Sequence, residues 1–81
     1  MKTVSIKMLA ETLGKSEEDV TESLRYGWTT ELLAVAGGVS ANYLCKLLRR
    51  GKLDGFHMSR VWVVDKDAGN TWLGNKGVRI E

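Results

Sequence analysis

Cys45 and His57 are the single cysteine and the single histidine of the 81-residue chain, so they are the one pair that could join a thiol nucleophile to an imidazole base. We instead interpret Cys45 as a small, semi-buried apolar residue of a helix. The sequence holds no glycine-rich phosphate loop and no carboxylate pair with supporting acid–base partners. One cysteine excludes an internal disulfide, and one cysteine with one histidine supplies too few good ligands for structural zinc. We therefore expect no catalytic residue, no metal site and no cofactor, and interpret the protein as a non-enzyme.

The charged residues are divided unevenly between the two halves of the chain. Residues 1–39 hold four basic and six acidic residues, a net charge of −2, whereas residues 40–81 hold eight basic and four acidic residues, a net charge of +4. A basic second half is typical of a chain that meets a polyanion. Two ordinary solvated faces would give the same distribution, so charge alone leaves both interpretations open.

Residues 40–51 have the pattern of an amphipathic helix. Ser40 predicts the N-cap and Gly51 predicts the stop. The buried stripe is expected to contain Leu44, Leu47 and Leu48. Helical geometry then turns outward the side chains of Ala41, Asn42, Tyr43, Lys46, Arg49 and Arg50.

These outward side chains suit the major groove of duplex DNA, and Ser40 is counted with them because it caps the end of the helix that would point at the DNA. Asn42 can form two hydrogen bonds with adenine, and Lys46 can reach guanine. Ala41 is small enough to lie against a thymine methyl group, and Tyr43 can reach a phosphate or a base edge. Phosphates are the expected partners of the basic residues at the end of the helix and after it, Arg49, Arg50 and Lys52.

Periodicity and turn residues predict the other elements. Two helices are expected at residues 4–13 and 17–26, the second capped by Ser16, and a third from Thr29 or Thr30 to residue 36. Two strands at 53–58 and 60–64, joined by a tight turn at Ser59, are followed by a short helix that Asp65 or Asp67 caps. Residues 74–81 are expected to form a loop and tail.

The two helical pairs are related by an internal repeat with an offset of 24 residues. Identical residues in the two copies are Leu9/Leu33, Ala10/Ala34, Gly14/Gly38, Ser16/Ser40, Leu24/Leu48, Arg25/Arg49 and Gly27/Gly51. Each copy has the layout of a helix-turn-helix. The first copy, however, carries Glu17, Glu18, Asp19 and Glu22 where the second has its outward-facing set. Phosphates would repel those acids, so we interpret residues 1–28 as a brace or a protein-contact surface.

Three segments of the second half follow one another in a characteristic order: Leu48-Arg49-Arg50-Gly51-Lys52-Leu53, then Arg60-Val61-Trp62-Val63-Val64, then Trp72-Leu73. With these segments, residues about 30–73 resemble the excisionase/MerR-like winged helix-turn-helix family. The resemblance implies a mainly α fold with a small β-hairpin wing, preceded here by a second helix-turn-helix-like pair. It also implies that Arg60 at the wing tip meets the minor groove or backbone, and that Trp62 is core. His57, on the first wing strand, is expected to be an exposed residue or a phosphate neighbour.

Two positions depart from that family's pattern. Ser59 stands at the wing tip where the family usually has glycine, which predicts a looser hairpin or another turn type. Val61 and Val63 stand where polar or basic residues are common, so they either pack under the N-terminal segment or form an exposed apolar patch. Both alternatives weaken the case for direct contact between this strand and DNA.

We expect one domain, residues 1–81, made of the N-terminal helical pair (1–28), the winged unit (29–73) and a tail (74–81). The expected function is sequence-specific double-stranded DNA binding, as an excisionase-like factor or a small regulator of a phage or mobile element, with self-association on DNA. Besides DNA, an integrase or another protein is an expected partner of the acidic half. The alternative function is a non-enzymatic interaction or assembly module, such as a phage DNA-packaging small-subunit domain. The sequence shows no membrane span and no secretory signal, so we expect a cytoplasmic, nucleoid-associated protein.

Overall fold

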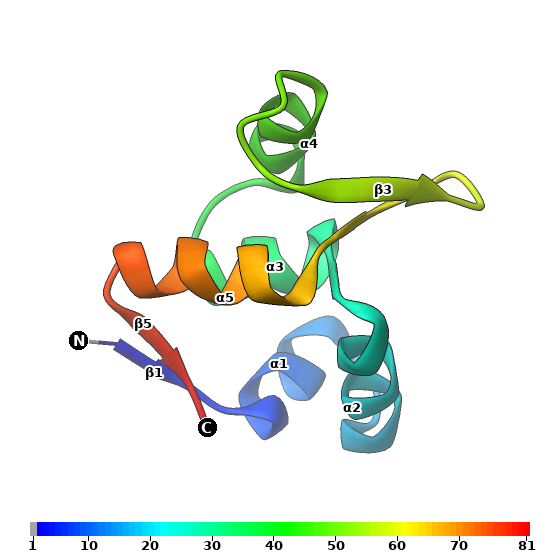
Figure 1. The fold of residues 1–81 in the computed structure, drawn as a ribbon. Helices are drawn as coiled ribbons and strands as arrows, with labels where there is room; N and C mark the ends of the chain where they lie inside the picture. Colours follow the sequence, from blue (N-terminus) through cyan, green and yellow to red (C-terminus); the bar gives the residue numbers. More distant parts are fainter. Residues whose placement is uncertain (1) are drawn as a thin grey trace.

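The structure of the protein, a computed structural model, describes residues 2–81 and combines five helices with two small β-sheets (Figure 1). Its elements in chain order are β1 (Lys2–Val4), α1 (Ile6–Leu13), α2 (Glu17–Tyr26), β2 (Trp28–Thr29), α3 (Thr30–Gly37), α4 (Ala41–Arg49), β3 (Gly55–Met58), β4 (Val61–Val64), α5 (Lys66–Asn75) and β5 (Val78–Ile80). The expected helices and hairpin are therefore present. The fold is less purely helical than expected, because the hairpin belongs to a larger sheet.

The strands form two small sheets. An antiparallel sheet has the order β2-β4-β3, so the hairpin gains a third strand through the pairs Trp28–Val64 and Thr29–Val63. A parallel pair, β1 and β5, joins the two ends of the chain (Figure 1). The strands β1, β2 and β5 were not predicted, because strands of two or three residues are too short to show a period of two.

The parallel pair changes the expectation for both ends of the chain. Val4 belongs to β1 and Ser5 caps α1, so the first helix begins two residues later than predicted. Residues 78–80, expected to form a tail, pair with residues 2–4, and Val78 is buried. Burial of these two apolar side chains, Val4 and Val78, against the core stabilises the paired conformation of both ends.

The predicted helix caps are confirmed by hydrogen bonds. The hydroxyls of Ser16 and Ser40 accept from backbone N–H groups three residues on, each at 3.1 Å. Of the two alternatives at the other starts, Thr29 caps α3 and Asp65 caps α5. Each cap satisfies one N–H group that the first turn leaves without an intrahelical partner.

The internal repeat is reproduced in the turn geometry of the two helical pairs. Gly14 and Gly38 have nearly equal dihedral angles, φ 66°, ψ 32° and φ 69°, ψ 33°, in the left-handed region that favours glycine. The residue after each glycine donates its N–H to the alanine four residues before that glycine, at 2.9 Å to Ala10 and 3.0 Å to Ala34. The turns of the pairs α1–α2 and α3–α4 therefore share one backbone geometry.

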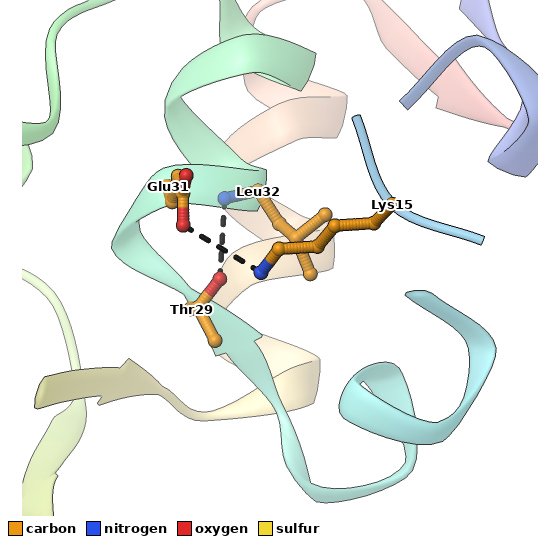
Figure 2. A network of polar contacts seen from close by, with 4 residues as sticks. All are labelled: Lys15, Thr29, Glu31 and Leu32. Carbon is orange, nitrogen blue, oxygen red and sulfur yellow. Dashed lines mark hydrogen bonds and ion pairs between the residues drawn. The ribbon is translucent and has the colours of Figure 1, made fainter. Parts of the chain in front are cut away.

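A polar contact ties the turn of the first pair to the start of the second pair. The Lys15 ammonium lies 3.7 Å from the Glu31 carboxylate, beside the Thr29 hydroxyl that accepts from the Leu32 N–H at 3.2 Å (Figure 2). Both ion-pair partners are largely exposed, so their attraction contributes little to stability. The cap at Thr29 orients the first turn of α3 directly after β2.

Trp28 lies at the centre of the core and is only 2% exposed. Its indole N–H donates to the Asn70 Oδ1 at 2.9 Å. A Cβ added at Gly69, on the buried side of α5, would overlap the Trp28 Cδ1. The indole therefore rests directly on the α5 backbone, and a side chain at position 69 would separate α5 from β2.

We predict that Gly69→Ala destabilises the fold by about 1–3 kcal/mol, since the added methyl group overpacks the Trp28 contact although alanine favours helices. Gly74→Ala is the matched control on the same helix, because a Cβ there meets no atom within 4 Å. That control should be neutral or stabilising by up to about 1 kcal/mol. Urea unfolding followed by circular dichroism measures both changes, and equal effects would contradict the packing described for Trp28.

Candidate nucleic-acid interface

Helix α4 is held against the protein by its leucines and leaves its polar side chains outward. Leu44 and Leu48 are buried, whereas Leu47, expected in the same stripe, is only half-buried. A Cβ at Gly55 would lie 2.6 Å from the Leu48 Cδ2, so the base of β3 passes close beneath α4. This contact fixes the hairpin relative to the helix.

The structure exposes most of the side chains expected to face outward. On and just after α4 the exposed residues are Asn42, Tyr43, Lys46, Arg49, Arg50 and Lys52, and the cap residue Ser40 is exposed as well. Ala41 differs, because it is half-buried and packs against the core. A half-buried methyl group at the first turn of the helix has less surface to offer a thymine than the sequence suggested.

The basic side chains of this region have no acidic partner in the described part of the chain. Residues 41–60 contain one acid, Asp54, and five cations, Lys46, Arg49, Arg50, Lys52 and Arg60. None of the five takes part in an ion pair within residues 2–81, where the pairs formed are Lys15–Glu31 and Glu22–Arg25. Their charge is therefore not neutralised locally and is available to an anionic ligand.

The hairpin turn places Arg60 at its tip. Ser59 and Arg60 both have positive φ, 47° and 71°, as a two-residue type I′ turn requires at its central positions. The registry Met58–Val61 to Gly55–Val64 has no irregularity. Serine in place of glycine therefore leaves the hairpin tight, although left-handed backbone costs a non-glycine residue more.

The aromatic residues His57 and Trp62 lie opposite each other on the hairpin. His57 pairs with Trp62 in register, with ring centroids 5.2 Å apart and planes tilted by 56°. His57 is exposed and Trp62 is half-buried. Trp62, expected in the core, therefore lies at its margin. The tryptophan that the fold encloses is Trp28, which lies outside the residues covered by the family resemblance.

The two valines of β4 have different surroundings. Val63 is buried, and its Cγ1 would lie 2.9 Å from a Cβ at Gly27, so it packs under the segment that leads into β2. Val61 is 45% exposed. Phe56 and Met58 are exposed on the neighbouring strand, in register with Val63 and Val61. Each of the two alternatives for these valines thus holds for one of them: Val63 packs under the preceding segment and Val61 belongs to an exposed apolar patch. The contribution of Phe56 and Met58 to that patch was not predicted, although cross-strand register in a two-residue hairpin would have revealed it.

The acidic side chains of the first helical pair lie away from the basic region. Glu17, Glu18, Asp19 and Glu22 are exposed on α2, and α2 and α4 lie at opposite ends of the molecule (Figure 1). The ends of the protein thus carry opposite charge. One geometry, used twice, presents an acidic helix at one end and a basic helix at the other.

A depression of about 560 Å³ lies between the segment after α4 and helix α5, and the charged residues of its lining are Asp54, Asp65, Asp67 and Lys52. The three carboxylates outnumber the one cation, so the depression is a poor site for a phosphate. Within residues 2–81, no group of three or more His, Cys, Asp or Glu side chains is arranged to hold a metal ion.

The longest helices of residues 2–81 have 10 residues, about half of what a bilayer requires, so none of them can cross a membrane.

Comparison with protein-family models, with curated proteins and with solved structures gives no match to this chain.

Proposed function

We propose that this protein is a winged helix-turn-helix that binds double-stranded DNA, with α4 as the recognition helix in the major groove and the β3–β4 hairpin as the wing. The observation that carries the proposal is the set of five exposed cations on α4, on the segment after it and at the hairpin tip, which have no ion-pair partner within residues 2–81. A duplex carries about one negative charge per 1.7 Å of axis and would neutralise them.

The positions of the α4 side chains suggest two roles, contact with base edges and binding of phosphates. Asn42 and Tyr43 lie in the first turn, where a recognition helix approaches base edges, and Lys46 follows one turn later on the same face. Arg49 and Arg50 lie at the other end of the helix, which suits phosphate contacts. The helix N-terminus also brings partial positive charge towards the duplex.

The wing supplies a second point of contact. Arg60 is held at the tip by a turn of fixed geometry, and an arginine that projects from a hairpin can enter the minor groove or meet the backbone beside α4. His57 adds an exposed imidazole on the same hairpin. The exposed Val61 contributes nothing to phosphate binding, so the tip rather than the strands is the expected DNA contact.

Excisionase-like direction of recombination or control of a phage or mobile-element promoter is the proposed biological role, with DNA packaging as a related alternative. This role depends on the family resemblance of residues about 30–73. A single winged unit buries little DNA surface, so several copies are expected to bind adjacent sites.

The acidic face of α2 supports a second candidate, a protein-interaction module. Its exposed acids form one surface at the far end from α4 (Figure 1).

Fluorescence anisotropy with labelled duplex DNA at several salt concentrations separates DNA binding from the protein-interaction function. DNA binding through four or five phosphate contacts predicts a slope of log affinity against log salt of roughly −3 to −5, whereas no binding at low salt would leave the interaction module.

We predict that Asn42→Ala and Lys46→Ala each lose about 1–3 kcal/mol of discrimination between specific and random duplexes. Arg49→Ala and Arg50→Ala should instead weaken all sequences alike and reduce the salt slope by roughly 1 each. A selected-site experiment followed by anisotropy titrations measures both effects. If the first two variants bind all duplexes as the unmodified protein does, α4 is not the recognition helix.

We predict that Arg60→Ala lowers DNA affinity while the melting temperature changes by no more than a few degrees, since the side chain is exposed. Arg79→Ala is the matched control, because Arg79 is an exposed cation on β5, outside the proposed interface. Equal losses of affinity in both variants would show a general charge effect and would argue against the wing contact.

A further inference from the structure

Strand β3 is an open edge of the antiparallel sheet. The order β2-β4-β3 gives it one neighbour, β4, and all four of its residues are exposed. Natural proteins protect such an edge with charges, prolines or bulges. The strand Gly-Phe-His-Met has no lysine, acid or proline, and its registry with β4 has no bulge.

The backbone groups on this edge can be assigned from the pairing with β4. In a two-residue hairpin, the residues that flank the turn, Met58 and Val61, form a hydrogen-bonded pair. Bonding then alternates along the ladder, in agreement with the Asp65 N–H that donates to the Asp54 carbonyl at 2.9 Å. The N–H and C=O groups of Gly55 and His57 therefore point away from β4, towards the open edge.

We infer that this edge pairs with the same edge of a second copy, in an antiparallel two-fold dimer centred on Phe56. In this register Gly55 of each copy faces His57 of the other, which satisfies all four outward backbone groups on each edge through four hydrogen bonds. The two Phe56 side chains meet on the axis at a close, non-hydrogen-bonded position. The apolar patch of Phe56, Met58 and Val61 becomes continuous across the two copies.

Charge complementarity favours the same pairing. Asp54 precedes β3 and Arg60 follows it, so an antiparallel neighbour brings Asp54 of one copy diagonally towards Arg60 of the other, twice by symmetry. A diagonal separation of about 7–8 Å lies within reach of a long side chain. Both residues are exposed and neither has an ion-pair partner within residues 2–81.

The dimer has a defined shape. A two-fold axis perpendicular to the sheet keeps the same face of both copies on one side, so both α4 helices, which pack over Gly55, lie on one side of a six-stranded sheet. The interface is small, and such interfaces are transient. This inference goes beyond the proposed DNA binding and does not depend on it, because the dimer forms without DNA.

Cysteine cross-linking tests the register directly, in a Cys45→Ser background that removes the native thiol. Phe56→Cys places two sulfurs across the axis, where paired Cα atoms about 4.5 Å apart permit a disulfide. His57→Cys is the matched control on the same strand, because its two copies would be roughly 8 Å apart, beyond disulfide range. We expect rapid covalent dimerisation of the first variant and slow dimerisation of the second, and equal rates would overturn the proposed pairing.

Charge reversal tests the same dimer without cysteines. Sedimentation velocity over a rising protein concentration, in the absence of DNA, should show self-association of the unmodified protein. Asp54→Lys and Arg60→Asp should each weaken it by about threefold or more, and the double variant should restore it. A protein that stays monomeric at every concentration, or a double variant no better than the singles, would overturn the inference. Circular dichroism of each variant verifies that its fold is intact.

Discussion

The contact of Trp28 with the backbone of α5 is the interaction on which the rest of the arrangement depends. The indole is buried between β2 and the glycine side of α5, and its N–H is satisfied by Asn70. Through β2, the same residue joins the hairpin to the sheet by pairing with Val64. One residue therefore connects the sheet, through its backbone, with the last helix, through its side chain.

This connection explains how the protein orients a hairpin that has little core of its own. An isolated two-stranded hairpin is at best marginally stable in water. Here β4 is anchored by β2 on one side, while Leu48 of α4 covers the base of β3. The end of the hairpin remains free, so Arg60 projects from a rigid base. A hairpin built in this way can hold an arginine at a fixed position relative to α4.

The two helical pairs show that one backbone geometry can present opposite charges. Both turns use a left-handed glycine and a serine cap, because these residues satisfy the local backbone. The buried positions are equally alike: Leu9 and Leu33, and Val20 and Leu44, are all enclosed. The exposed positions are not constrained by packing, so one copy could carry acids and the other cations. We attribute binding to the second copy for this reason.

The sequence by itself determined the features that depend on local chemistry. Caps at Ser16 and Ser40, glycine turns at positions 14 and 38, and the buried leucines of α4 follow from hydrogen-bonding capacity, backbone freedom and a period of 3.6 residues. The exposed cations of α4 followed from the same period. These predictions needed no partner distant in the chain.

Only the tertiary structure decided the features that depend on distant partners. The strands β1, β2 and β5 are too short to carry a periodic signal, and they exist because residues 2–4 meet residues 78–80 and residues 28–29 meet residues 63–64. The same holds for Trp28, whose place in the core depends on its contact with Gly69, a residue 41 positions away in the sequence. Burial of Val63 and exposure of Val61 were likewise decided by where β2 ends, since a strand of alternating valines does not reveal which of them a neighbour will cover.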